Sequence, residues 1–273
     1  MFIEKSRIDM DATLFSGQAF RWDRVEGGFV GCTLDNPAII KELDNGYEII
    51  SLKDDAFWEN YFDLDRDYSL IAKRHEDDEK VKNAFECCPG LRVMNQPVWE
   101  CVCGFIISAN NNIERIRGIM RRLGENLGEP MTLDGKLFYS LPTPEALVKC
   151  GTDGLYKLGL GYRAPYLYET SKMVMDGFDL QGLKDMGYDA ALKELLKLKG
   201  VGEKVADCIL LFSCGYDNAF PVDVWVKRVM GSLYGVEGTT KVVKKSAFEL
   251  FGNDAGIVQQ ALFHSARLKM IEV

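Results

Sequence analysis

Lys204 and Asp223 are the two residues of this sequence whose types and spacing suit covalent chemistry. They lie nineteen residues apart, in the segments Leu198-Lys199-Gly200-Val201-Gly202-Glu203-Lys204 and Phe220-Pro221-Val222-Asp223-Val224-Trp225. A neutral lysine amine can attack carbon and form a Schiff base, and a carboxylate can stabilise a positive charge that develops beside it. Simpler roles stay open, because Asp223 also suits the N-cap of the next helix and Lys204 could be only a phosphate contact.

Two glycines just before Lys204 predict a tight hairpin between two helices. Glycine permits positive φ and a close approach, so the N–H groups of Gly200, Gly202 and Val205 could point at a phosphate beside a helix N-terminus. A helix, a hairpin and a second helix in this order can grip DNA without reading its sequence. An ordinary corner between two helices would use the same glycines, so the pattern alone does not decide whether this segment binds DNA.

The length and composition predict a globular protein of two domains. The chain has 273 residues, of which 47% are hydrophobic, enough for a large buried core. Its eight cysteines have neither the spacing of a disulfide framework nor that of a zinc or iron–sulfur site, so we expect reduced thiols and no metal or other cofactor. We place the domain boundary between residues 1–95 and 96–273.

Charge and hydropathy restrict location and partners. We find no apolar targeting segment and no apolar stretch long enough to span a membrane, so we expect a cytoplasmic protein with no membrane contact, associated with the nucleoid if its organism is bacterial. The formal net charge of −8 argues mildly against nucleic acid as a partner. Lysine and arginine nevertheless gather around 115–122, 197–204 and 241–245, which suits either a local basic surface or solvated helix faces.

The hydrophobic periodicity, which predicts the strands and helices that must position these residues, changes along the chain. Short β-rich runs at 28–34 and 47–51, with turn signals between them, predict a small antiparallel sheet near the N-terminus. From Asp54 onward the pattern is helical. The fold class is therefore α+β, with helices expected at 66–85, 97–109, 112–127, 143–150, 164–176, 188–198, 203–214, 223–234, 240–251 and 254–270.

The hairpin, the lysine and the aspartate together resemble the signature of the helix-hairpin-helix DNA glycosylases. The chain resembles the 8-oxoguanine DNA glycosylase/lyase family in particular, which implies a small β-sheet domain packed on a helical core of two lobes. Five further segments match that family in order along almost the whole chain. They are Ser16-Gly17-Gln18-Ala19-Phe20-Arg21-Trp22, Tyr61-Phe62-Asp63-Leu64-Asp65, Ser108-Ala109-Asn110-Asn111-Asn112-Ile113, Leu158-Gly159-Leu160-Gly161-Tyr162-Arg163-Ala164 and Gln259-Gln260-Ala261-Leu262-Phe263.

The resemblance implies a pocket for a base that has been flipped out of the duplex. In it, Phe263 and Cys208 would lie against the two faces of the base, and Gln259 would bond its Watson–Crick edge. The carbonyl of Gly17 would accept the hydrogen that 8-oxoguanine carries on N7 and guanine lacks, and Pro221 would line the site. Judged one at a time, such apolar helical positions are more often core residues.

The resemblance also implies how the duplex is held. Asn110, Arg115 and Arg163 would fill the gap and pair with the cytosine left behind, and Tyr162 would act as a wedge that keeps the duplex kinked. The implied partner is double-stranded DNA with 8-oxoguanine opposite cytosine, bound by a monomer. Arg115 could instead be a solvated helix residue, and Tyr162 a loop aromatic packed on the body.

The implied reaction uses Lys204 as the nucleophile at C1′ of the deoxyribose and Asp223 as the carboxylate that assists it. The Schiff base that forms permits β-elimination of the 3′ phosphate. Two positions depart from the family, because Lys199 replaces a common proline and Trp225 stands where eukaryotic members commonly have histidine. Lys199 could add a phosphate contact, whereas Trp225 puts in doubt the hydrogen bonding around the 5′ phosphate. Both departures leave the lysine and aspartate pair intact.

Two other functions stay open. An alkyl-base glycosylase of the same fold would need the aspartate but not Lys204. A non-catalytic helix-hairpin-helix module would need neither the aspartate loop nor the pair Gln259 and Phe263. An adenine-mismatch glycosylase is excluded, because the cysteines that would hold its cluster are missing.

Overall fold

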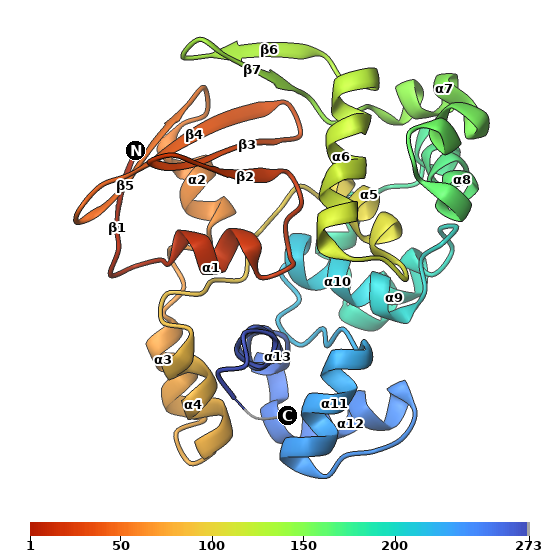
Figure 1. Ribbon diagram of the computed structural model, residues 1–273. Coiled ribbons are helices and arrows are strands. Elements are labelled where there is room, and N and C mark those ends of the chain that lie inside the picture. Colours follow the sequence, from red (N-terminus) through yellow and green to blue (C-terminus); the bar gives the residue numbers. More distant parts are fainter. Residues whose placement is uncertain (272–273) are drawn as a thin grey trace.

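The N-terminal residues form a five-stranded antiparallel sheet with strand order β1-β5-β4-β3-β2 (Figure 1). The computed structural model describes residues 1–271. Gly28 must be glycine, because a Cβ there would lie 2.0 Å from the carbonyl oxygen of Ile40 on the neighbouring strand. The strands are β1 (Phe2–Glu4), β2 (Trp22–Val25), β3 (Gly28–Thr33), β4 (Asn36–Glu42) and β5 (Gly46–Ser51).

Two short helices pack with this sheet around an aromatic core. Both α1 (Met10–Phe15) and α2 (Asp55–Tyr61) begin at an aspartate N-cap, and Asp9 and Asp54 accept hydrogen bonds from backbone N–H groups of the first turn. Trp22, Trp58 and Phe62 are fully buried between the helices and the sheet. The sequence pattern did not predict α1 or α2, because six or seven residues are too few to show a helical period.

The remaining chain is mainly helical and builds two hydrophobic clusters, one in each lobe. This confirms the α+β prediction. The helices of the first lobe are α5 (Val98–Ser108), α6 (Ile113–Leu127), α7 (Pro144–Lys157), η1 (Gly161–Arg163), α8 (Ala164–Met175), η2 (Gly182–Asp185), α9 (Tyr188–Leu195) and α10 (Glu203–Ser213). The second lobe contains α11 (Val224–Tyr234), α12 (Thr240–Phe251), η3 (Gly252–Asp254) and α13 (Ala255–Arg267), and the helix α4 (Glu79–Cys87) packs against α13.

Two predictions about the elements were wrong. The helix expected at 66–85 is divided into α3 (Tyr68–Arg74) and α4 (Glu79–Cys87), because Asp78 caps the second helix by accepting from Lys80 N and Val81 N. The sequence pattern also missed a hairpin of β6 (Pro130–Leu133) and β7 (Lys136–Tyr139). Asp134 and Gly135 form its turn with positive φ, and such a short pair of strands carries a weak alternation signal.

The two lobes are held together at α10 by a buried ion pair. Asp207 of α10 is fully buried, and Lys244 of α12 donates to its two carboxylate oxygens over 3.0 and 2.8 Å. The Tyr188 hydroxyl of α9 donates to the same carboxylate over 2.7 Å. Burial raises the pKa of Asp207 and Lys244 opposes that rise. Removing one partner would leave a buried charge uncompensated, so this contact locks α9, α10 and α12.

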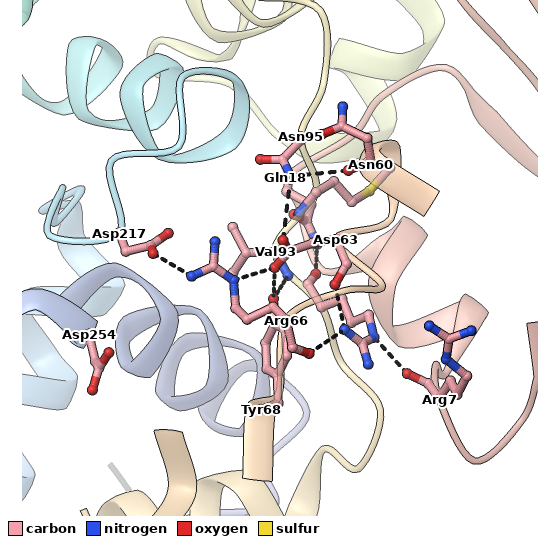
Figure 2. Close-up of polar contacts among 12 residues, drawn as sticks. Arg7, Gln18, Asn60, Asp63, Arg66, Tyr68, Val93, Asn95, Asp217 and Asp254 are labelled. Carbon is pink, nitrogen blue, oxygen red and sulfur yellow. Dashed lines mark hydrogen bonds and ion pairs between the residues drawn. The ribbon is translucent and has the colours of Figure 1, made fainter. Parts of the chain in front are cut away.

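A second polar junction ties the loop after α1 to the segment that leads into α5 (Figure 2). Gln18 is fully buried, and its amide nitrogen donates to the carbonyl oxygens of Thr13 (2.9 Å) and Arg92 (2.7 Å). Its amide oxygen accepts from Met94 N over 2.8 Å. Gln96 donates to the Gln18 carbonyl over 2.8 Å. Gln18 therefore determines where the neighbouring Gly17 lies.

Beside Gln18, Arg66 joins the same junction to the loop that connects the two lobes (Figure 2). Its guanidinium pairs with Asp63 over 2.6 Å and with Asp217 in the loop after α10. Asp63 has a φ of 52°, and the Arg92 guanidinium donates to its carbonyl over 2.5 Å. The residues between α2 and α5 therefore act as a polar clamp between the sheet and the helices.

We predict that Gln18→Met lowers the free energy of unfolding by about 2–3 kcal/mol, because it fits the space but leaves several buried backbone groups without partners. Urea unfolding followed by circular dichroism measures this change. Gln181→Ala is the matched control, since Gln181 is exposed. Equal stability of the two variants would show that the Gln18 amide is not needed.

Candidate active site

A cavity of about 720 Å³ lies where α5, α6, α10, α11 and α13 approach the loop after α1. Lys204 and Asp223 both line it, although they come from different helices. The other side chains and backbone around it are mostly apolar or amide in character. They belong to Gly17, Phe20, Phe105, Ser108, Ala109, Asn110, Asn111, Asn112, Ile113, Glu114, Ile116, Val224, Trp225, Phe263 and Arg267.

Lys204 stands in the first turn of α10 with its side chain half-buried. The amine nitrogen lies 5.4 Å from the centroid of the Phe105 ring, which forms an apolar wall beside it. Cys208 lies one turn further along the same helix and is buried. Burial raises the pKa of the Cys208 thiol to about 11, against the opposing effect of Lys204. The thiol is therefore protonated near neutral pH, and the Lys204 side chain lines the cavity.

Asp223 is the N-cap of α11, as the sequence predicted. Its Oδ1 accepts a hydrogen bond from Val226 N over 2.8 Å, and its backbone is extended with φ −107°. This bond orients the carboxylate at the N-terminus of the helix, where negative charge is stabilised. Oδ2 makes no hydrogen bond within residues 1–271, so Asp223 combines capping with one carboxylate oxygen left for a second partner.

Gly17 and Phe263 form the wall of the cavity opposite α10. Gly17 has φ 93°, and a Cβ built on it would lie 3.4 Å from Ile113 Cδ1 and 3.7 Å from Phe263 Cε1. The positive φ favours glycine, whereas these neighbours lie at ordinary van der Waals distances. The structure thus brings together two of the predicted base-binding residues that are far apart in the sequence.

The other three predicted base-binding residues do not line the cavity. Cys208, Pro221 and Gln259 are all buried. Gln259 Oε1 is a buried acceptor with no hydrogen-bond partner within residues 1–271. A buried amide oxygen without a partner costs free energy, so Gln259 is available for a ligand that reaches it. Contact of these residues with a base stays a prediction.

The hairpin before Lys204 has the predicted geometry. Gly200 has φ 78°, and a Cβ there would lie 2.7 Å from Tyr166 Cβ of α8. Gly202 caps α10 without a side-chain hydrogen bond. The backbone hydrogen bonds of the described chain include none donated by Gly200, Gly202 or Val205. These N–H groups sit beside a helix N-terminus, an arrangement that binds anions.

A loop that carries Asn110 forms the rim of the cavity. Asn110 is exposed and has φ 48°. Arg163 holds the backbone of this loop, because its buried guanidinium donates to the carbonyls of Ala109 (2.8 Å) and Asn110 (2.7 Å). The Tyr162 hydroxyl also donates to the Ala109 carbonyl, over 2.9 Å, with its ring 48% exposed. In this arrangement Arg163 positions Asn110, and a contact of Arg163 with cytosine stays a prediction.

Arg115 and Trp225 lie near the same rim. Arg115 is exposed in the first turn of α6, where Asn112 caps the helix by accepting from Arg115 N over 2.9 Å. Trp225 is 42% exposed, and the Arg228 guanidinium lies 5.3 Å from its ring centroid. Val224 is 68% exposed beside it. An exposed aromatic and an exposed aliphatic residue at the mouth of this cavity suggest a contact surface.

Sequence reasoning missed Arg267, which also lines the cavity. The signal was present, because Gln259, Phe263 and Arg267 recur every four residues on one face of α13. Phe20 and Phe105 were missed as well, and they stack edge to face with centroids 5.5 Å apart. Their positions in the sequence look like ordinary core positions, so no local signal distinguishes them.

Two findings bear on membranes and metals. No helix within residues 1–271 combines the length and the apolar character that a membrane crossing requires. Within the same residues, histidine, cysteine, aspartate and glutamate nowhere form a group of three or more that could hold a metal ion.

Comparison with known proteins agrees with this geometry. Residues 1–102 match the model of the 8-oxoguanine DNA glycosylase N-terminal domain, and residues 103–252 match the HhH-GPD superfamily of base excision DNA repair proteins. The sequence is 30% identical to a probable N-glycosylase/DNA lyase of Methanothermobacter thermautotrophicus, over 98% of this chain and 96% of that protein.

Solved structures are similar over the whole length. The 8-oxoguanine glycosylase/lyase of Clostridium acetobutylicum, in complex with double-stranded DNA containing cytosine opposite 8-oxoguanine, is 33% identical with a TM-score of 0.92, over 99% of each chain. The 3-methyladenine DNA glycosylase of Archaeoglobus fulgidus has a TM-score of 0.81 over 98% of this chain and 99% of that one, but at 23% identity it shares the fold alone. The chain therefore belongs to the 8-oxoguanine DNA glycosylase family, within the helix-hairpin-helix superfamily of base excision DNA repair proteins.

Proposed function

We propose that this protein is a bifunctional DNA glycosylase and lyase that excises 8-oxoguanine from duplex DNA, with cytosine as the opposite base. The observation that carries the proposal is the single cavity lined by Lys204, Asp223, Gly17 and Phe263. A nucleophile, a carboxylate and a wall that suits a purine therefore face one space. One chain supplies all four residues, so we propose that the enzyme acts as a monomer, in the compartment that holds the chromosome.

Recognition of the lesion requires that the damaged nucleotide leave the duplex, at a cost of a few kcal/mol. Stacking of the base on Phe263 offsets part of that cost. The Gly17 carbonyl accepts the N7 hydrogen of 8-oxoguanine, whereas guanine offers an acceptor at N7 that the carbonyl repels. The orphaned Gln259 amide oxygen can accept from a donor on the Watson–Crick edge of the base.

Removal of the base proceeds through Lys204. The neutral amine attacks C1′ of the deoxyribose, and the C1′–N9 bond breaks so that its electron pair leaves with the base. Asp223 stabilises the positive charge that develops on the sugar. After the amine loses a proton and the sugar ring opens, the Schiff base permits β-elimination of the 3′ phosphate. The chain's own lysine and carboxylate suffice for these steps, so we propose that no cofactor takes part.

Binding of the duplex uses the hairpin and the rim. The N–H groups of Gly200, Gly202 and Val205 bind a phosphate next to the N-terminus of α10. Asn110 and Arg115 occupy the gap left by the flipped nucleotide, and the exposed ring of Tyr162 wedges the stack open. Arg163 acts through the Asn110 loop that it supports, and we propose that it also pairs with the opposite cytosine.

Lys204 argues against an alkyl-base glycosylase, although that class shares the fold. Excision of a base that already carries a positive charge needs no amine nucleophile, and here a lysine amine stands in the cavity. A non-catalytic DNA-binding module would have no use for a carboxylate oxygen without a hydrogen bond beside that lysine.

We predict that Lys204→Gln abolishes base release and the adduct that borohydride traps, because the cavity then has no amine at C1′. Affinity for 8-oxoguanine DNA is expected to remain, since glutamine preserves much of the side-chain length. Single-turnover excision and a trapping gel measure these effects, with Lys41→Gln on the exposed part of β4 as the control. A covalent adduct with Lys204→Gln would place the nucleophile elsewhere.

Asp223→Asn is predicted to bind DNA and to react slowly. Asparagine caps helices about as well as aspartate, so the fold persists. The lost charge is expected to reduce the rate of base release by about 10²–10³, as for other single electrostatic groups. Asp54→Asn is the matched control, because Asp54 caps α2 outside the cavity. A rate within twofold of wild type would remove Asp223 from the mechanism.

Phe263→Ala is predicted to weaken binding of 8-oxoguanine DNA by roughly 1–3 kcal/mol, the usual contribution of one stacked base. Binding of undamaged duplex is expected to change little, because no base enters the cavity. Fluorescence anisotropy with both duplexes measures the difference, and Phe248→Ala on the exposed face of α12 is the control. An equal loss of affinity for both duplexes would identify Phe263 as a core residue only.

A further inference from the structure

Arg267 is a cation in the cavity wall that the proposed mechanism does not use. It lies in the last turn of α13, one turn after Phe263. One guanidinium nitrogen, Nη2, donates to the Phe15 carbonyl over 2.9 Å. The other, Nη1, is shielded from solvent and has no hydrogen-bond partner within residues 1–271. The guanidinium is thus held by a hydrogen bond from Nη2, whereas, within the described chain, the buried donor Nη1 remains free for a ligand.

The charge of Arg267 is not neutralised within the described chain, unlike that of its neighbours. Arg24 pairs with Asp11 over 2.5 Å, and Arg117 pairs with Asp23 over 2.9 Å. No carboxylate of residues 1–271 forms an ion pair with Arg267, and burial followed by repulsion from Arg24 lowers the pKa of its guanidinium. An arginine stays protonated even so. A partly buried cation without an anion costs stability, which favours a functional role.

Arg267 Nη1 lies close to two of the predicted base-binding residues, Gly17 and Phe263. A Cβ built on Gly17 would lie 3.4 Å from Nη1, next to the point where it would meet Phe263. The donor therefore lies beside the glycine whose carbonyl we assign to the N7 hydrogen of the lesion. In 8-oxoguanine the N7 hydrogen is flanked by two exocyclic oxygens, O6 and O8, so a donor beside Gly17 complements one of them.

We propose that Arg267 is a catalytic residue that donates a hydrogen bond to an exocyclic oxygen of the oxidised purine and stabilises the base as it leaves. When the C1′–N9 bond breaks, the electron pair passes to the base, and its negative charge spreads to the exocyclic oxygens. A fixed guanidinium in a site of low dielectric favours that charge more than it favours the neutral base, so it accelerates base release. This inference rests on the proposed function.

The lyase step allows the role of Arg267 to be distinguished experimentally from that of Lys204. An abasic site has no base to leave, so β-elimination at a preformed abasic site needs Lys204 but no contact at the exocyclic oxygens. Arg267→Gln should slow single-turnover release of 8-oxoguanine by about 10²-fold, the effect of removing one donor to a developing anion. It should leave β-elimination at the abasic site within about threefold of wild type, because the group removed acts only on the base.

Two further variants control this test. Arg24→Gln removes a neighbouring charge that is exposed and already paired, so both rates should match wild type. Arg267→Lys keeps the charge and a donor but not the fork of the guanidinium, so base release should fall less than with Arg267→Gln. Since Arg267 also holds the Phe15 carbonyl, thermal unfolding of each variant is measured alongside the rates.

The outcomes distinguish this inference from the proposed function. Equal losses of base release and β-elimination in Arg267→Gln would make Arg267 a structural residue, and unchanged base release would exclude a contact with the leaving base. Either result would overturn the inference alone. A wild-type protein that cleaves abasic sites but never releases 8-oxoguanine would overturn the proposed substrate, and the role of Arg267 with it.

Discussion

The burial of α10 is the constraint on which the site depends. Every residue of this helix from Val205 to Ser213 is buried, and only its first turn reaches the cavity. The helix packs against α5 and α9 in the first lobe, and Asp207 joins it to α12 in the second. Because the body of the helix cannot rotate or slide without exposing apolar surface, its N-terminus holds a constant position. That N-terminus presents both the N–H groups of the hairpin and the amine of Lys204.

Lys204 and Asp223, the pair that we propose to be catalytic, are divided between the two helical lobes, so their geometry is a property of how the lobes meet. Lys204 belongs to the first lobe and Asp223 to the start of the second. Close backbone packing maintains the junction: Gly256 N donates to the Asp217 carbonyl over 2.6 Å, and a Cβ on Gly256 would lie 2.5 Å from the Ala219 carbonyl oxygen. A side chain at position 256 would push α13 away from the loop that leads to Asp223.

The sheet domain contributes Gly17 to the wall of the cavity that Lys204 also lines. Gly17 follows α1, and the buried amide of Gln18 ties that turn to the segment before α5. Arg66 extends the junction to Asp217, which lies in the loop between α10 and α11. The small domain is therefore connected by polar contacts to the same loop that leads to Asp223. This connection explains physically why a base pocket can be shared between a β-sheet domain and a helical core.

Local chemistry allowed much of the site to be predicted from the sequence. The hairpin follows from two glycines, the cap from an aspartate before a helix, and the shared helix face of Gln259 and Phe263 from a spacing of four residues. The sequence predicts one helix in place of α3 and α4, because the turn from the C-cap His75 to the N-cap Asp78 contains no glycine or proline that would mark a break. The hairpin of β6 and β7 was missed because four-residue strands carry little pattern.

The tertiary structure alone decided which distant residues meet. It placed Gly17 against α13, buried Arg163 beneath the Asn110 loop, and left Arg267 in the wall with a spare donor. Such contacts depend on how whole helices pack, and the sequence around the residues involved does not predict them. The sequence by itself determined the chemical groups and the helix ends that orient them. The packing of the lobes and the sheet determined the space that those groups share, because a cavity exists only between segments that are far apart in the chain.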